Sequence, residues 1–368
     1  MTMQGAPVYL GYSKQASKLA FFCHFTILLT LGFLSSGCQM GYIIKNGYYQ
    51  ADLLWRRVAI DKVISDPNTN AETKRKLLLA KEAKDFAEKH LGLKQTKNYE
   101  TYVSLKDRYV TYAVSAAQAY ELKPHLWHFP IVGSLPYKGY FTKNEAIKEQ
   151  EVLKSQGLDT YLRGVSAYST LGWFNDPLLS SMLAYDDHDL VNVVIHESVH
   201  ATIYISSQAD FNEQLATFLG NKGTELFYLK KEGQNSKVLE KIKSENQDDS
   251  VFAQFIKVEL AALGDWYRDV VVISPEIKTK RLGELAQRFE VSVMPKLRSE
   301  NYKKFASLPL NNAVLLTYKT YFNDLNSFEL LFRAMGHDFQ KLMDFCRTLE
   351  KDKVPEETLK NKIKELST

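Results

Sequence analysis

The spacing of apolar residues predicts helices over most of the chain. Residues 41–95 repeat apolar positions at helical intervals, and Ala71–Leu93 is rich in Ala, Lys, Glu and Leu. Intervals of three and four also predict a helix over Tyr99–Tyr120. From Asp189 to the C-terminus nearly every segment is predicted to be helical. The exception is the polar stretch Glu232–Ser250, which we expect to be a mobile excursion.

A short region with a different pattern of apolar and polar residues interrupts the predicted helices. Alternating segments with many aromatic residues predict strands. These are Trp127–Gly133, Tyr137–Phe141 and Tyr161–Thr170, with a turn at Ser134–Pro136 between the first two. Helical spacing returns over Asn144–Gln156. The pattern predicts an α+β fold, predominantly helical with a small sheet. No linker divides residues 38–368, which we expect to form a single domain.

The first 37 residues have the layout of a secretory signal peptide. A basic region without acids precedes the apolar run Leu19–Leu34, and small residues follow up to Gly37. Cys38 comes directly after them, which is typical of bacterial lipoproteins, whose cysteine is acylated on its thiol and whose signal peptide is cleaved just before that residue. Gln39 is not the aspartate that commonly retains such proteins in the inner membrane. We therefore expect residues 1–37 to be removed and Cys38 to anchor the protein to the periplasmic face of the outer membrane.

Two other interpretations of the N-terminus stay open. The apolar run could be a transmembrane anchor, although its 16 residues are fewer than the roughly 20 that a spanning helix needs. It could also belong to an ordinary cleaved signal peptide without a lipid. Of the three interpretations, acylation is the one that gives the thiol of Cys38 a role.

Charge and cysteine content exclude several classes of protein. The formal net charge is +4, and removal of residues 1–37 takes away two lysines and no acid, which leaves +2. Nothing in that balance predicts nucleic-acid binding. Of the three cysteines, Cys23 lies in the leader and Cys38 is the lipid site, so Cys346 has no partner for a disulfide. No Cys-x-x-Cys pair exists, which excludes a cysteine-based zinc site.

The segment His196-Glu197-Ser198-Val199-His200 is the strongest chemical signal in the sequence. It lies within an apolar stretch without Gly or Pro, so we expect a helix of about 15 residues. Positions four apart share one helix face, which lets the two imidazoles converge on one zinc ion. Glu197 is offset by one position and can act as general base on a water beside the metal.

Glu213 is the predicted third ligand. It follows His200 by 13 residues, and a helical hairpin would bring it back over the two histidines. Two alternatives stay open, because Asp210 and Glu213 also fit a capping box and Glu225 could replace Glu213 as the ligand. A His₂Glu set with one open position favours zinc over iron.

At this point the sequence resembles the predicted aminopeptidase lipoproteins of bacteria, a gluzincin-like group. The resemblance covers most of the mature chain. It is carried by Phe129–Gly133, Tyr137–Phe141, Ala167–Phe174, Asp176–Leu179, the two histidines with Glu197, Phe211–Glu213, Leu310–Ala313 and Tyr321. It implies a zinc site of His196, His200 and Glu213, with Glu197 catalytic and the small sheet beside the metal helix. His128 and Ser134 stand where the family pattern has cysteines, so a family disulfide or thiol pair is missing here.

The resemblance also suggests roles around the metal. Gluzincins commonly pair the substrate backbone with an edge strand, which here would be Ala167–Gly172, although an ordinary sheet edge explains that segment equally well. A tyrosine often stabilises the oxyanion. We expect Tyr168 in that role, before Tyr321 and Tyr204, although each could simply be a packing residue. Asp176, Asp186 or Asp187 could hold a substrate amine, and nothing in the sequence distinguishes them.

The predicted function is therefore that of a membrane-anchored zinc metallopeptidase, an aminopeptidase by its family resemblance, which acts on peptides. One alternative is a non-catalytic zinc-binding envelope lipoprotein that binds peptides or envelope partners. Another is a helical scaffold whose histidine motif is accidental and binds no metal.

Overall fold

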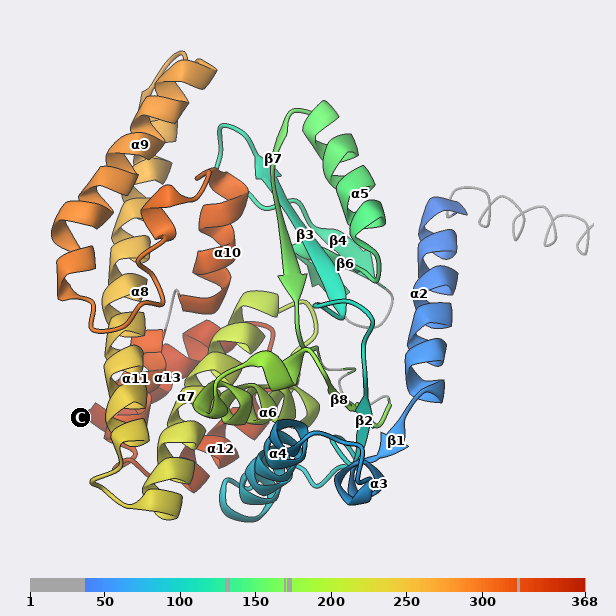
Figure 1. Ribbon diagram of the computed structural model, residues 1–368. Coiled ribbons are helices and arrows are strands. Elements are labelled where there is room, and N and C mark those ends of the chain that lie inside the picture. Colours follow the sequence, from blue (N-terminus) through green and yellow to red (C-terminus); the bar gives the residue numbers. More distant parts are fainter. Residues whose placement is uncertain (1–36, 130–132, 169, 171–173, 323–324, 368) are drawn as a thin grey trace, which may run out of the picture. The chain divides into compact units, whose positions relative to one another are not determined.

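The computed structural model describes residues 37–129, 133–168, 170, 174–322 and 325–367 (Figure 1). The chain divides into two units, residues 1–55 and 56–368. The described part of the first unit is helix α2 (Gly37–Trp55), which contains Cys38. The leader, residues 1–36, lies outside the described residues. In the described part of the chain, no helix is both long enough and apolar enough to span a bilayer.

The second unit is an α+β fold in which helices predominate. Its helices are α3 (Ile60–Ser65), α4 (Ala71–His90), α5 (Lys143–Ser155), α6 (Asp187–Thr202), α7 (Ala209–Glu232), α8 (Lys237–Asp269), α9 (Pro275–Ser292), α10 (Asn312–Phe322), α11 (Leu325–Ala334), α12 (Phe339–Thr348) and α13 (Pro355–Ser367). Its strands are β1 (Val58–Ala59), β2 (Thr101–Val103), β3 (Thr111–Gln118), β4 (Trp127–Phe129), β5 (Gly133–Leu135), β6 (Tyr137–Tyr140), β7 (Leu158–Val165) and β8 (Leu178–Leu179). Fold class and helix content therefore agree with the sequence pattern.

Three small sheets form among the described residues, and the one in the order β6-β3-β7 lies between α10 and α5. β3 pairs antiparallel with both neighbours, so Tyr137, Ser115 and Tyr161 lie in one row across the sheet. Because side chains alternate along a strand, these residues share a face with Ala117. That face packs on α10 through Ala117 and Leu316, while α5 lies on the other side (Figure 1).

The predicted helix over Tyr99–Tyr120 is wrong, because this stretch forms β2 and β3. β3 is the central strand, and its residues from Ala113 to Ala117 are all buried. A strand covered on both faces loses the alternation of apolar and polar residues that identifies an exposed strand. The remaining apolar spacing then resembled that of a helix.

Three further boundaries differ from the sequence predictions. The stretch Glu232–Ser250 is not an excursion, because α8 begins at Lys237 after Ser236 caps it and buries Leu239 and Ile242. Ser134–Pro136 is not a simple turn, since Ser134 belongs to β5, which pairs with β4. The strand at Tyr161–Thr170 ends instead at Val165. The segment that was to pair with substrate, Ala167–Gly172, lies beyond that end and partly outside the described residues.

Helices α6 and α7 form the hairpin that carries the candidate metal ligands His196, His200 and Glu213. Two glycines of α7 allow the helices to approach closely. A Cβ atom on Gly223 would lie 2.7 Å from Leu91 Cδ1 and 3.0 Å from Ile195 Cγ2, closer than side chains tolerate. A Cβ on Gly220 would lie 3.4 Å from the Cβ of His196. The absence of side chains at these positions brings α7 against the face of α6 that bears the motif.

Candidate metal centre

Helix α6 orients His196 and His200 toward one point. The two residues are one turn apart, and their Nε2 atoms lie 3.2 Å from each other. Neither ring is free to swing into solvent, since the exposed fraction of the side chain is 16% for His196 and 8% for His200. Two nitrogens with lone pairs this close repel each other unless a proton or a cation lies between them.

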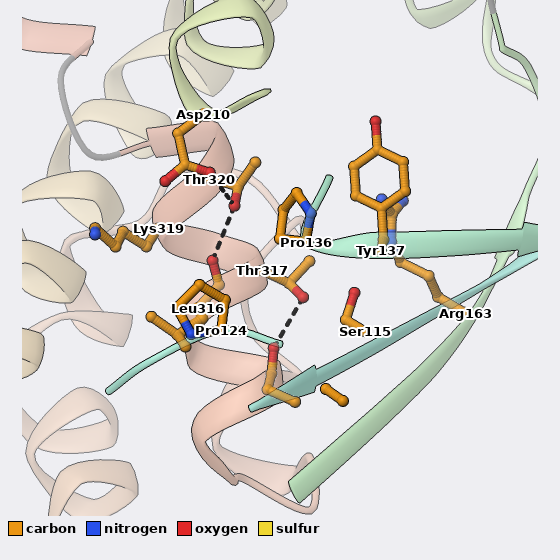
Figure 2. Close-up of a pocket in the computed structure, with 12 residues that line it drawn as sticks. Ser115, Pro124, Pro136, Tyr137, Arg163, Asp210, Leu316, Thr317, Lys319 and Thr320 are labelled. Atoms are coloured by element: carbon orange, nitrogen blue, oxygen red, sulfur yellow. Dashed lines mark hydrogen bonds between the residues drawn. The ribbon is translucent and has the colours of Figure 1, made fainter. Parts of the chain in front are cut away.

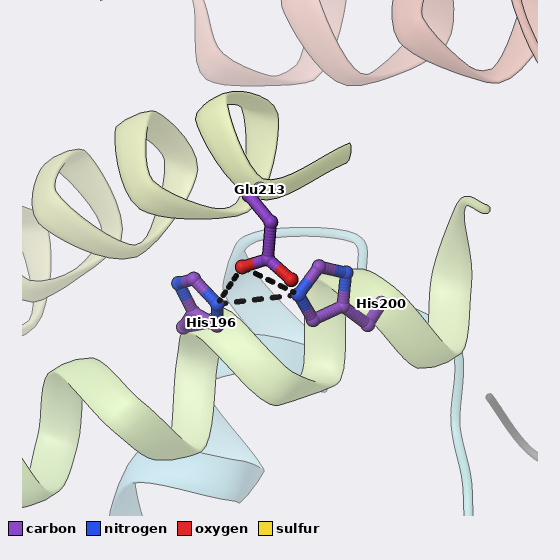
Figure 3. Close-up of side chains that lie close together, drawn as sticks. All are labelled: His196, His200 and Glu213. Carbon is purple, nitrogen blue, oxygen red and sulfur yellow. Dashed lines mark hydrogen bonds and ion pairs between the residues drawn. The ribbon is translucent and has the colours of Figure 1, made fainter. Parts of the chain in front are cut away.

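Helix α7 supplies the third group, Glu213 (Figure 3). Its Oε2 atom lies 3.5 Å from Nε2 of His196 and 3.7 Å from Nε2 of His200. Its neighbour Asn212 fixes the loop before it, because the buried amide accepts from the Ile205 N–H at 2.9 Å and donates to the Ile205 carbonyl at 2.7 Å. This two-point contact sets the start of α7 and with it the direction of Glu213.

The capping interpretation of this region is wrong. The N-cap of α7 is Gln208, and no side chain caps the helix. Asp210 lies within the first turn and accepts a hydrogen bond from Thr320 Oγ1 on α10 at 2.8 Å. The carboxylate of Glu213 therefore points at the imidazoles.

The spacing of the three atoms fits a metal ion. Sides of 3.2, 3.5 and 3.7 Å define a circle of radius about 2.0 Å, so one point lies about 2.0 Å from every donor atom. Metal–nitrogen and metal–oxygen bonds in zinc proteins are about 2.0–2.2 Å long. His196, His200 and Glu213 are thus a group that could hold a metal ion. The other ring nitrogen of His200, Nδ1, is buried and has no hydrogen-bond partner among the described residues.

Burial and neighbouring charges shift the pKa values of the two glutamates of the site in opposite directions. Burial raises the pKa of Glu197 to about 7, with His196 opposing the shift and Glu213 adding to it. Burial would also raise the pKa of Glu213, but His200 and His196 outweigh it and hold that pKa well below its usual range. One carboxyl group can therefore exchange a proton near neutral pH, while the other stays ionised beside the histidines.

Tyr137 is a site residue that the sequence analysis missed. It lies on β6, and its hydroxyl donates to Oε1 of Glu213 at 3.3 Å. Tyr137 stands in a segment of the family resemblance, but no spacing rule connects it with a residue 76 positions later. The Glu213 carboxylate also affects Tyr204. Burial raises the pKa of the Tyr204 hydroxyl to about 12, and the negative charge of Glu213 adds to this shift.

The other predicted residues lie elsewhere or have other partners. Tyr168, the first choice for oxyanion stabilisation, packs edge-on against Phe141 with ring centroids 6.3 Å apart, and its catalytic role stays a prediction. The side chain of Tyr321 lies outside the described residues. Glu225, the alternative ligand, accepts a hydrogen bond from Asn246 and lies 3.6 Å from Lys222.

The three acids considered for a substrate amine all have protein partners. Asp176 is buried and accepts from the backbone and hydroxyl of Thr170 at 2.9 and 2.7 Å. Asp186 pairs with Lys241 at 3.1 Å, and Asp187 pairs with Arg75 and Lys76. These contacts give each acid a structural role.

His128 and Ser134, which replace the expected cysteines, are direct cross-strand partners in the β4–β5 pair. Nδ1 of His128 and the hydroxyl of Ser134 lie 2.7 Å apart, at hydrogen-bonding distance. A hydrogen bond thus occupies the place where the resemblance implies a thiol pair.

Comparison with known proteins identifies one family. The model of the family described as "Putative aminopeptidase" matches residues 41–360, a span that includes α6, α7 and the β6-β3-β7 sheet. No curated protein and no solved structure matches the chain.

Proposed function

Since the chain belongs to the family described as "Putative aminopeptidase", we propose that it is a zinc metallopeptidase whose site is formed by His196, His200, Glu213 and Glu197. The observation that supports this most is the convergence of three donor atoms on a point about 2.0 Å from each. The β6-β3-β7 sheet beside this hairpin gives the gluzincin-like arrangement that we propose for the fold.

Zinc is the metal that best fits the donor set. Two neutral imidazoles and one carboxylate are a common catalytic zinc set, in which a fourth position stays open. Among the described residues, no lysine or arginine forms an ion pair with Glu213, so its negative charge is available to a metal ion. When bound, zinc would supply a Lewis acid that polarises the scissile carbonyl and acidifies a water molecule.

Glu197 and Tyr137 would perform the remaining protein chemistry. With a pKa of about 7, Glu197 can accept a proton from the attacking water and pass it to the leaving amine. Tyr137 donates to Oε1 of Glu213, and this contact would help to hold the carboxylate while its Oε2 atom lies near the two histidines. Water supplies the hydroxyl of the new acid, and the leaving group departs as a neutral amine.

We further propose that the protein is anchored in the bacterial envelope through a lipid on Cys38, at the periplasmic face of the outer membrane. The support is the sequence alone, in which an apolar run and small residues precede Cys38. Metabolic labelling with an alkynyl fatty acid tests it. Wild type should be labelled and Cys38→Ser should not, and an unlabelled wild type would refute acylation.

The experiment for the peptidase compares metal content and peptide hydrolysis in three proteins. Wild type should contain about one zinc ion and cleave peptides. Glu197→Gln should retain the zinc and lose activity on the order of 10²–10⁴-fold, because only the general base is removed. His200→Ala should lose both. Zinc without hydrolysis in wild type would favour the non-catalytic zinc lipoprotein, and absence of bound metal would leave only the scaffold interpretation.

A further inference from the structure

The small cavity between the β6-β3-β7 sheet and α10 has room for about one water molecule (Figure 2). Its volume is about 40 Å³, and a water molecule occupies about 30 Å³ in the liquid. On its α10 side, the Thr320 hydroxyl donates to Asp210 at 2.8 Å and joins α10 to α7. The cavity therefore suits a structural water rather than a substrate side chain. A much larger apolar surface lies on the outside of helix α2.

This surface is an apolar stripe that follows one face of α2. Ile44, Tyr48, Ala51 and Trp55 succeed one another at intervals of four, three and four, so they share a helix face. The exposed fraction is 66% for Ile44, 70% for Tyr48 and 91% for Trp55, and Ala51 is exposed as well. Large apolar side chains that lie together on a surface mark a site of interaction.

The polar residues of α2 lie away from the apolar stripe. Lys45 and Asp52 each directly follow a stripe residue, so each is rotated by about 100° from it. Their charges are opposite, and α2 has no other acidic or basic residue. The helix thus combines an apolar face, a polar flank and no net charge. A helix with an apolar and a polar face can lie in the plane of a membrane interface, where Tyr and Trp rings sit at the level of the headgroups.

The position of Cys38 determines which partner the stripe can reach. Cys38 lies in the first turn of α2, and the stripe begins six residues later, about 9 Å along the helix. A lipid on Cys38 would hold this end of α2 at a bilayer surface. The stripe continues to Trp55, about 26 Å from Cys38 along the axis. All of it contacts the same bilayer only when α2 lies along the surface.

The size of the stripe argues against a second copy of the chain as the partner. A large apolar side chain buries on the order of 100 Å², so the stripe offers roughly 400 Å² at most. A stable protein–protein interface buries about 800 Å² on each partner. A bilayer sets no such minimum, because each inserted side chain adds its own contribution.

We propose that the apolar stripe of α2 binds the surface of a lipid bilayer and holds the helix flat in the membrane interface. This inference goes beyond the proposed peptidase activity and rests on the proposed lipid at Cys38 only for its reach to the membrane. The lipid would fix one end of α2, and the stripe would fix its length. The second unit begins at Arg56, directly after Trp55, so it would start at the membrane surface.

Vesicle binding without the lipid tests the inference. The protein is the chain without residues 1–37 and with Cys38→Ser, which carries no acyl group. Sedimentation with phosphatidylcholine vesicles would give its partition coefficient. Tyr48→Glu should lower this coefficient about 10-fold or more, because it replaces an inserted ring by a charge. Val291→Glu is the matched control, since Val291 is a 73% exposed valine on α9, and it should have no effect.

Tryptophan fluorescence would show whether α2 itself enters the interface. Vesicles should shift the emission of the Cys38→Ser protein to shorter wavelength, because Trp55 leaves water. Trp55→Phe should bind within about threefold of the same affinity and lose that shift, since phenylalanine keeps most of the apolar surface. Addition of anionic phosphatidylglycerol or of salt should change binding little, because α2 has no net charge.

Four results would overturn the proposal. They are failure of the Cys38→Ser protein to bind vesicles, equal weakening by Tyr48→Glu and Val291→Glu, binding that needs anionic lipid and disappears in salt, and a dimer in solution that Tyr48→Glu dissociates. Labelling of Cys38 is a separate outcome. Vesicle binding without labelling of wild type would refute the lipid and leave the stripe, and labelling without vesicle binding would do the reverse.

Discussion

Helix α6 carries two groups of potential metal ligands, one at each end, and their surroundings differ. At the C-terminal end, His196 and His200 meet Glu213 with no lysine or arginine paired to the carboxylate among the described residues. At the N-terminal end, Asp186, His188 and Asp189 also lie within 4.8 Å of one another. The side chains of both acids there are more than half exposed.

Ion pairs with α8 already satisfy the N-terminal group. Lys241 lies 3.1 Å from Asp186, and Glu245 lies 2.8 Å from Nε2 of His188. The first contact pairs Asp186 with a cation, and the second fixes the imidazole of His188. Proximity of ligand atoms alone is therefore a poor indicator of a metal site. Burial and the absence of a protein counter-charge distinguish the C-terminal group from the N-terminal one.

The largest expected difference is between the effects of substituting His200 and of substituting His188. His200→Ala should abolish stoichiometric zinc binding and reduce peptidase activity on the order of 10³-fold or more, because it removes a donor atom. His188→Ala should keep both within about threefold, since its contact with Glu245 is structural. Elemental analysis and peptide cleavage would measure these effects. Zinc loss in His188→Ala alone would reverse the assignment.

The effect of metal removal on the melting temperature should show which of the two ligand groups on α6 binds the ion. Ligand binding at free metal 1,000-fold above Kd stabilises a protein by about 4 kcal/mol, so a chelator should lower the melting temperature of wild type by several degrees. His200→Ala should melt at the same temperature with and without chelator. A similar chelator effect in both proteins would mean that the metal binds elsewhere.

The close packing of α6 and α7 should tolerate no side chain at Gly223. A Cβ there would lie 2.7 Å from Leu91 Cδ1, so Gly223→Ala should cost about 1–3 kcal/mol of unfolding free energy and weaken zinc binding. Gly283, on α9, is the matched control, because a Cβ there meets no atom within 4 Å. Gly283→Ala should be neutral or stabilise by up to about 1 kcal/mol. Denaturant melts of both variants would measure the difference.

The smallest expected effect is a pH dependence of the metal-free protein. Because folding raises the pKa of Glu197 to about 7, this residue favours folding below its unfolded pKa near 4.5, and that contribution is lost as pH rises through 7. Metal-free Glu197→Gln should therefore match wild type near pH 4.5 and melt at a higher temperature at pH 8. Parallel melting curves from pH 4.5 to 8 would contradict the role of burial.

The sequence predicted the local parts of the site better than the parts that depend on the fold. Helix α6 and the shared face of His196 and His200 follow from spacing four apart within one apolar segment. The proximity of Glu213 was an inference from a helical hairpin, and the Asn212 contacts that fix the hairpin were not visible in any pattern. The catalytic roles assigned to Glu197 and Tyr168 stay predictions.

Long-range pairing accounts for what the sequence could not predict. Tyr137 reaches Glu213 because β6 pairs with β3, and that register depends on the whole sheet. β3 itself was mistaken for helix because its burial on both faces removed the strand period. The relation of Asp210 to Thr320 likewise joins α7 to α10 over 110 positions.

The presence of His128 and Ser134 where the family resemblance implies a thiol pair has a consequence for biogenesis. The β4–β5 hairpin is joined by a hydrogen bond that needs no electron acceptor to form. Cys346 is buried, and burial raises the pKa of its thiol to about 12, so it stays protonated and resists oxidation. Maturation of the described fold is thus independent of oxidative folding catalysts, and reductants should leave it intact.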